Sequence, residues 1–267
     1  MRPDVFDLRT FYETAEGLLA RRLILRALRR LWPDLERTRL LGIGYPLPFL
    51  PPAPGGRAVA VMPHNQGACP WCAGRGNRVA LAREDELPFA DGMFERVLLV
   101  HALEGARHPS RLLREVWRVL ADGGRLVVMV PNRHGLWCWS DRTPFGHGHP
   151  YTVGQLERLL RAQLLEPVSE DHALYMPPVR SALLRRLAIP LERFGLRLAP
   201  QFSGVLLIEA EKRIYVAPPV SAVECRKRRR YVPVQPAVVS DRLSEGGSAY
   251  DADRHHRADG RESCGAT

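Results

Sequence analysis

The sequence predicts an α/β fold built on a doubly wound, mostly parallel sheet. Three observations support this: an apolar stretch at 95–100 follows a turn cluster, a helical pattern covers 110–120, and a Gly-Gly turn then leads into a second apolar stretch at 125–130. Strand, crossover helix and strand make a βαβ unit. Such a unit places two parallel strands side by side, with their carboxyl ends facing one crevice.

Length and composition fit one domain of ordinary size with appendages. The chain has 267 residues, and its hydrophobic content of 45% is enough to build a core. No apolar run approaches the ~18–20 residues that a membrane span needs. The first residues carry no apolar segment of the secretory type, so we expect a cytoplasmic protein.

The net charge of +10 comes almost entirely from arginine, since only Lys212 and Lys227 are lysine. A basic balance can indicate nucleic acid or anionic lipid as a partner. Here arginine is spread along the whole chain, and the run at 226–230 is typical of a solvated surface. Contact with nucleic acid or a membrane through Arg-rich segments stays as the alternative.

The five cysteines do not predict a disulfide framework, because their number is odd. Cys69 and Cys72 form a CxxC pair in a Gly- and Pro-rich loop. A zinc site needs a second ligand pair, and a redox pair is expected to open a helix after a strand. We therefore interpret the two residues as loop thiols.

The first elements are a helix and a strand. Apolar residues recur at helical spacing over 8–32, with arginines on another face, and Pro33 ends the pattern. We expect this helix to pack on the sheet; an amphipathic helix on anionic lipid or RNA is the alternative. A strand follows at 39–44, and the five prolines of 45–54 then exclude a long helix.

The remaining elements follow from local patterns. We predict strands at 57–62 and 78–82, and a helix at 152–162 with Thr152 as its N-cap. A strand is expected within 165–176, one or two short helices broken at Pro190 within 179–198, and a last strand or hairpin arm within 204–216.

Composition changes after the last predicted strand. Residues 219–267 lack a sustained apolar period and are rich in Arg, Asp, Ser and Gly, which is typical of a disordered tail. The expected organisation is an N-terminal helical segment at 1–38, an α/β domain at 39–217 and a basic, polar tail at 218–267.

The best-defined segment resembles the second half of class I S-adenosylmethionine-dependent methyltransferases of the type-11-like group. It contains Leu87-Pro88-Phe89-Ala90-Asp91, His101-Ala102-Leu103-Glu104, a Gly-Gly turn and Pro131-Asn132. The family has L-P-F-x-D, H-x-L-E-H, P-G-G and P-N in this order. The resemblance covers about 40–216. It implies a Rossmann-like seven-stranded sheet with helices on both faces, and S-adenosyl-L-methionine as cofactor.

The resemblance also implies cofactor-binding residues at the ends of the first two strands. Gly42 and Gly44 match the first two glycines of the family's first motif, and Tyr45 stands where small residues cup the methionine part. Met62 ends the second strand, where the family has an acid that holds the ribose. Met62 can pack against adenine but cannot replace that acceptor, and the loss costs ~1.5–3 kcal/mol.

The adenine amino group is held in the family by an Asp shortly before the Leu-Pro-Phe. This chain has Arg83 there, and Glu84 or Asp85 could substitute after a small loop shift. Alternatively, these acids only solvate the loop.

His101 follows the fourth strand, where the family lines the cofactor's methionine end and the substrate entrance. A histidine is suited to act as general base because its ordinary pKa lies near neutrality. Methyl transfer from a sulfonium often needs only positioning, however. The alternative is a histidine that caps backbone groups at the strand end.

The loop after the fifth strand is too long and too aromatic for a simple connection. In similar methyltransferases the matching loop covers the active site and selects the acceptor. We predict a lid around a small-molecule acceptor, formed by Trp137, Arg142, His147, His149 and Tyr151. His147 and His149 have no third ligand at suitable spacing, so no metal is expected.

The function expected from these residues is S-adenosylmethionine-dependent methyl transfer to a small or medium acceptor. The alternative is a catalytically inactive methyltransferase-like protein that serves as a binding or regulatory partner. The shortened glycine motif, Met62 and Arg83 favour this alternative, whereas the loop and the residues after the fourth strand favour the enzyme. A basic RNA- or membrane-associated protein is a third possibility.

Overall fold

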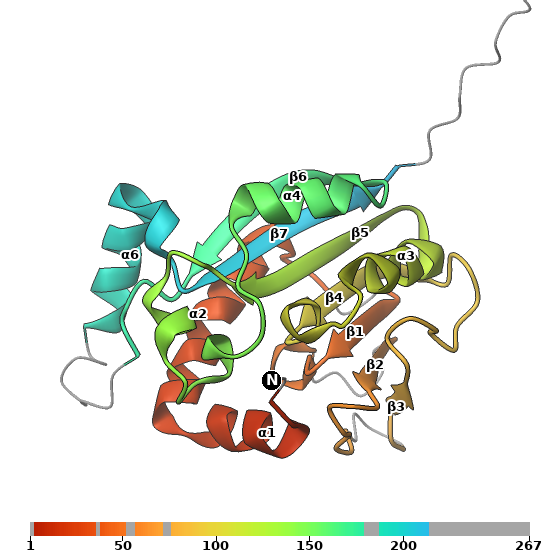
Figure 1. Cartoon of the computed structure of the whole chain (residues 1–267), viewed down its shortest axis with the longest axis horizontal. Coiled ribbons are helices and arrows are strands. Elements are labelled where there is room, and N and C mark those ends of the chain that lie inside the picture. The colour runs from red at the N-terminus through yellow and green to blue at the C-terminus, as the bar shows by residue number, and fades with distance from the viewer. Residues whose placement is uncertain (1–2, 36–37, 52–56, 72–75, 179–186, 214–267) are drawn as a thin grey trace, which may run out of the picture. The chain divides into compact units, whose positions relative to one another are not determined.

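Seven strands form one sheet in the computed structural model (Figure 1), which describes residues 3–35, 38–51, 57–71, 76–178 and 187–213. The strands are β1 (Leu40–Gly44), β2 (Ala58–Pro63), β3 (Val79–Ala82), β4 (Phe94–Val100), β5 (Leu120–Pro131), β6 (Leu165–Ala173) and β7 (Val205–Lys212). Their order is β3-β2-β1-β4-β5-β7-β6. Strands β1 to β5 run parallel, and β7 lies antiparallel between β5 and β6. The predicted fold class is confirmed.

Strand order reverses between β1 and β4. The chain runs from β1 outward to β3, and then returns to add β4 on the other side of β1. In sheets of this kind, ligands bind outside the carboxyl ends of the strands at the reversal. The topology therefore predicts a ligand site formed by the residues that follow β1, β2 and β4.

Helices cover both faces of the sheet. They are α1 (Val5–Glu13), α2 (Ala15–Leu31), α3 (Pro109–Val119), α4 (Val153–Arg161) and α6 (Ala188–Leu198). Side chains of α1 and α2 share one buried cluster with Leu40 and Leu98, whereas those of α3 and α4 share the other with Leu41 and Leu99. Neighbouring strand residues point to opposite faces, which explains the division. Between β1 and β2 the described residues form only the short 3-10 turn Leu47–Phe49, as the prolines predict.

The helix predicted over 8–32 is two helices, and Thr14 separates them. Its hydroxyl donates to the Phe11 carbonyl at 2.7 Å and accepts from the Gly17 amide at 3.0 Å. Thr14 is thus the C-cap of α1 and the N-cap of α2. A side chain at Gly17 would overlap the Phe11 carbonyl, so this glycine permits the close approach of the two helices.

Two further expectations differ from the structure. The Asp122-Gly123-Gly124 turn lies within β5, where the register with β4 shifts between Phe94 and Arg96 and Gly123 has a φ of +67°. Pro190 does not break a helix. It is the third residue of α6, in the first turn, where a backbone N–H has no partner within the helix.

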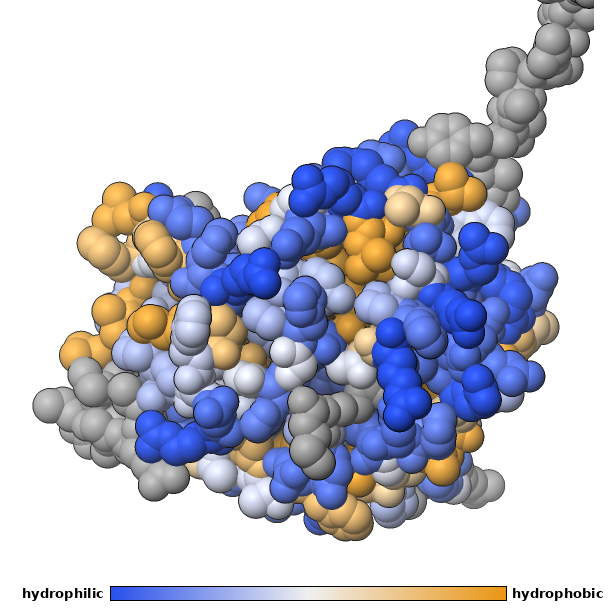
Figure 2. Space-filling model, viewed as in Figure 1, coloured by the Kyte–Doolittle hydropathy of each residue, from blue (hydrophilic) through white to orange (hydrophobic). Residues whose placement is uncertain are grey.

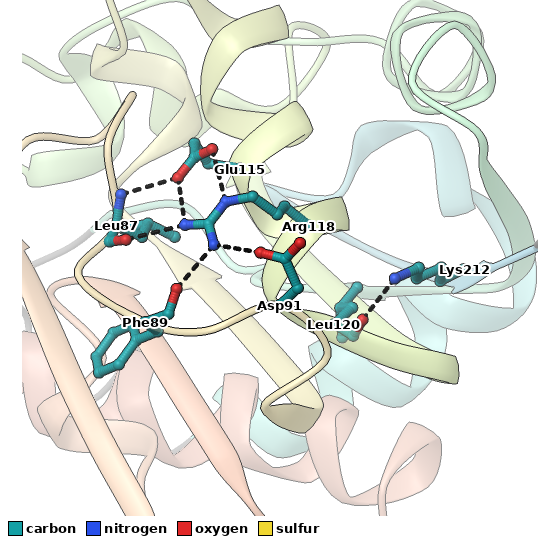
Figure 3. A network of polar contacts seen from close by, with 7 residues as sticks. All are labelled: Leu87, Phe89, Asp91, Glu115, Arg118, Leu120 and Lys212. Carbon is teal, nitrogen blue, oxygen red and sulfur yellow. Dashed lines mark hydrogen bonds and ion pairs between the residues drawn. The ribbon is translucent and has the colours of Figure 1, made fainter.

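Arg118 of α3 holds the Leu-Pro-Phe loop that precedes β4 (Figure 3). It donates to the carbonyls of Leu87 and Phe89 at 2.9 and 2.7 Å, and pairs with Asp91 and Glu115. Glu115 also accepts the Leu87 amide at 2.9 Å. Glu115 and Arg118 therefore have a structural role, because together they fix the loop at the start of β4.

The described residues all belong to one compact unit. The tail predicted over 218–267 lies outside the described residues, as does Cys72. Within the described part of the chain, no helix has the length and apolar content that crossing a membrane would require.

Candidate functional site

The exit of β1 is packed tightly against the end of β4. Gly44 has a φ of +92°, and a Cβ there would overlap the Val100 carbonyl. The next residue, Tyr45, donates its amide to that same carbonyl at 2.8 Å. Only glycine combines this backbone conformation with so close an approach. The sequence therefore places Tyr45 directly beside the residue that follows β4, His101.

Helix α1 lies against the carboxyl ends of three strands. The Val5 amide donates to the carbonyl of Gln66, which follows β2, at 2.9 Å. The Tyr12 ring stacks on Tyr45 after β1, with centroids 6.0 Å apart and planes 19° from parallel. The Tyr12 hydroxyl lies 2.8 Å from Nε2 of His101 after β4. One short helix thus covers the edge at which the strand order reverses.

Tyr12 belongs to a buried chain of polar groups that continues through His101 to Glu104. His101 Nδ1 lies 3.1 Å from Glu104 Oε1, and neither side chain is more than 4% exposed. Burial raises the pKa of Tyr12 well above its ordinary value, and the nearby Glu104 raises it further. Tyr12 therefore stays a neutral phenol that can donate its proton to His101. His101 itself has a φ of +49°, which is strained for a residue other than glycine.

Aromatic rings close the space around His101. Phe145 lies 5.1 Å from the His101 ring and 6.0 Å from Phe11, both measured between centroids. Gln66 donates its side-chain amide to the His101 carbonyl at 3.4 Å. Its Oε1 atom, like Oε2 of Glu104, is buried and without a hydrogen-bond partner among the described residues.

The other residues predicted to bind the cofactor have contacts that do not involve His101. Met62 is fully buried, and its sulfur accepts the Cys69 amide at 3.4 Å. Glu84 accepts the Arg107 amide at 3.1 Å, and Asp85 accepts two hydrogen bonds from Arg83 at 3.0 and 3.1 Å. Gly42, within β1, faces Pro46, whose Cβ and Cγ would lie 2.5 Å from a Cβ on that glycine.

The five residues predicted to bind an acceptor lie in three separate places. Arg142 and His147 line a cavity of about 740 Å³ between the start of the chain and the loop after β5. Trp137 is buried and donates its indole N–H to the Met176 carbonyl at 2.7 Å. His149 and Tyr151 contact each other edge to face, and their backbones are held by Glu104 and Pro131.

The cavity combines opposite charges with apolar walls. Its charged and titratable lining consists of Asp7, Glu16, Asp141, Arg142 and His147, with Phe11, Pro144 and Pro178 among the apolar residues. The residues predicted to bind the cofactor do not line it. The described residues contain no group of three or more metal-ligating side chains.

Sequence reasoning missed the part played by Tyr12, Phe11 and Gln66. Phe11 and Tyr12 read as ordinary core positions of an N-terminal helix, because their partners lie far along the chain. The contact between Tyr12 and His101 spans 89 residues. The one available signal was Thr14 followed by Gly17, which predicts a helix start and separates 5–13 as a helix of its own.

Comparison with known proteins identifies the segment that carries the resemblance. Residues 42–128 match the family model described as a methyltransferase domain. An uncharacterized protein of Mycobacterium tuberculosis is 32% identical over 111 residues, which is 39% of each chain. The ubiquinone/menaquinone biosynthesis C-methyltransferase UbiE of Chromobacterium violaceum is 34% identical over 67 residues, or 25% of this chain and 26% of that protein. This chain thus spans well under half the length of these curated relatives.

Solved structures share the fold over most of the chain. A SAM-dependent methyltransferase of Thermotoga maritima, described as a possible histamine N-methyltransferase, superposes with a TM-score of 0.56 at 17% identity, covering 78% of this chain and 96% of that one. A SAM-dependent methyltransferase of Archaeoglobus fulgidus gives 0.51 at 20% identity, covering 78% and 100%. Residues 42–128 therefore match the methyltransferase domain family, and the chain has the fold of these two solved methyltransferase structures.

Proposed function

We propose that this chain is an S-adenosylmethionine-dependent methyltransferase that acts on a small acceptor. The observation that carries the proposal is the turn at Gly44, which sets the exit of β1 against the end of β4 at the reversal of strand order. The methyltransferase-domain match over 42–128 and the partial identity to UbiE support it.

The side chains in the described arrangement leave no room for an adenosyl sulfonium beside Gly42 and Gly44. Pro46 and Leu50 fill the space in front of Gly42. Tyr45 is only 5% exposed because Tyr12 stacks on it. The residues therefore do not fit the cofactor as they are packed here, and we derive no catalytic step through it.

Cofactor binding in this proposal requires α1 to leave the edge of the sheet. A helix of nine residues has little stability of its own, so its position depends on its contacts with Gln66, His101 and Phe145. Thr14 provides a point where the chain can bend, since its backbone is extended between the two helices. Moving α1 takes Phe11 and Tyr12 away from the crevice and leaves α2 on the sheet.

The acceptor site of the proposal is the cavity lined by Arg142 and His147. Asp7 and Phe11 of α1 form part of its wall, so the same movement would change the cavity and open the crevice. A volume of about 740 Å³ lies in the range of small-molecule sites. Asp141, Arg142 and Pro144 lie outside α1 and remain when it moves, so we expect a small acceptor with both polar and apolar parts.

The test is a calorimetric titration of the full chain with S-adenosylmethionine and S-adenosylhomocysteine. We compare the natural chain with Tyr12→Ala, which removes the ring stack and the hydrogen bond to His101. If only the open molecules bind, the apparent affinity is the intrinsic affinity multiplied by the fraction of molecules that are open. Tyr12→Ala raises that fraction, so it should bind both ligands about tenfold more tightly. Phe6→Ala is the matched control, because Phe6 is an exposed aromatic residue of the same helix. Absence of heat with both the natural chain and Tyr12→Ala at millimolar ligand contradicts the proposal.

A second candidate function is a methyltransferase-fold binding protein without turnover. The filled crevice and the position of Met62, where the family has its ribose-binding acid, favour it. Mass spectrometry of the supernatant from denatured protein separates the two candidates. A bound S-adenosyl nucleoside supports the enzyme, whereas its absence together with a silent titration supports the binding protein.

A further inference from the structure

Helix α6 presents an apolar stripe to solvent. Four residues in α6 or directly before it recur at intervals of four, three and four: Leu187, Leu191, Phe194 and Leu198. They are 38–64% exposed. Residues at this spacing lie on one face of a helix. Figure 2 shows apolar side chains gathered over α6, at the left of the molecule.

The opposite face of α6 is fixed against the rest of the domain, so the helix cannot turn its stripe inward. The buried carboxylate of Glu192 accepts the amides of Leu174 and Tyr175 at 2.8 and 2.9 Å. A Cβ at Gly195 would overlap the Tyr175 ring, and Ala188 is completely buried. The stripe therefore faces outward because polar and small residues hold the inner side.

Positive charge flanks the stripe. Arg193 and Arg197 are both exposed, and no ion pair or hydrogen bond is found for either guanidinium within the described residues. The only carboxylate of the helix, Glu192, is turned inward. The outward side of α6 thus combines large apolar side chains with two cations, which is the pattern of a helix that lies in an anionic lipid interface.

We propose that α6 docks this protein on the surface of an anionic lipid bilayer. A helix of eleven residues is only about 16 Å long, too short to span the ~30 Å hydrocarbon core, so it would lie in the plane of the interface. Leu191 and Phe194 would enter the acyl boundary, and Arg193 and Arg197 would reach the headgroup phosphates.

Charge favours a bilayer over a second copy of the chain. A twofold contact places the same patch on both partners, so the arginines of one stripe would meet those of the other. An anionic surface complements these charges instead. This inference does not depend on the cofactor, because α6 lies on a different part of the domain from Gly44 and His101.

The test measures co-sedimentation of the full chain with phosphatidylglycerol vesicles and with phosphatidylcholine vesicles. The natural chain should bind the anionic vesicles, and Leu191→Glu with Phe194→Glu should lower the partition coefficient by tenfold or more. The matched control is Phe6→Glu with Leu18→Glu, which replaces two exposed apolar residues outside α6 and should leave binding unchanged. The Arg-rich segment at 226–230 is present in all variants, so its contribution cancels.

Two further measurements test the role of the arginines and the oligomeric state. Arg193→Glu with Arg197→Glu should reduce binding to anionic vesicles and leave the weaker binding to neutral vesicles unchanged. Light scattering reports whether the natural chain is a dimer that Leu191→Glu with Phe194→Glu separates. Such a dimer, equal binding of the α6 and control variants, or no binding of the natural chain overturns the proposal.

Discussion

At Gly44 the backbone leaves β1 in a conformation that residues with side chains rarely adopt, and a Cβ at this position would overlap the Val100 carbonyl. This residue therefore has two reasons to be glycine, and they can be separated. Gly123 shares the left-handed conformation, with a φ of +67°, but a Cβ there would meet nothing within 4 Å.

We expect Gly44→Ala to lower the free energy of unfolding by about 2–4 kcal/mol, because it adds steric overlap to backbone strain. Gly123→Ala should cost about 1 kcal/mol, since only the strain applies. Urea unfolding monitored by circular dichroism measures both. Equal losses for the two variants would show that the close approach to Val100 contributes nothing.

Glu115 predicts a specific dependence of stability on pH. The Arg118 side chain and the Leu87 amide hold the pKa of its carboxyl below the ordinary value of 4.5. Because the folded pKa is the lower one, the stabilisation is complete above the ordinary value and disappears as the pH falls through the folded pKa. Glu115→Gln should therefore destabilise the protein at neutral pH, and the difference from the natural chain should shrink below about pH 4.

Arg118→Met provides the background that tests the cause. When Arg118 is absent, Glu115→Gln should lose most of its pH-dependent effect, as a double-mutant cycle of thermal unfolding would show. An undiminished effect in that background would assign the shift to the Leu87 amide instead.

The contacts of Tyr12 could not be predicted from the local sequence. An aromatic residue in an amphipathic helix is expected to enter a core, and Tyr12 does. Which core it enters depends on packing between segments 89 residues apart. His101 could be placed at the end of its strand from the sequence, but its enclosure by Tyr12 and Phe145 could not.

Among the elements, α1 differs most from expectation. Its sequence pattern continues into that of α2, and the break at Thr14 depends on one hydroxyl that caps both helices. By contrast, the irregular segment after β1 follows directly from its prolines, and the capping box of α4 from Thr152 and Gln155.

Hydrogen–deuterium exchange can test the proposed movement of α1. With S-adenosylhomocysteine present, amides of Val5–Glu13 should exchange faster, because the helix gives up its contacts with Gln66 and His101. Amides of β5 serve as the internal control and should not change. Slower exchange in α1 would mean that the ligand binds with the helix in place.

For the whole molecule, the strands were predictable because buried parallel strands are nearly continuous apolar runs. Leu40–Gly44 and Phe94–Val100 match the expected strands to within one residue. The position of β7 between β5 and β6 was not predictable from these runs, because antiparallel insertion is decided by pairing rather than by composition. The packing of α1 on the ends of β1 and β4 was not predictable either, because the residues at the strand ends do not reveal what packs on them.

The insertion of β7 also affects how the chain is completed during synthesis. Strand β6 is an edge strand that pairs only with β7 in this sheet. During synthesis β6 therefore has no strand to pair with until Val205–Lys212 has left the ribosome. Until then β5 exposes an unpaired backbone edge, which is a template for intermolecular aggregation. A nascent polypeptide stopped at Gly204 is accordingly an aggregation hazard rather than a smaller working domain.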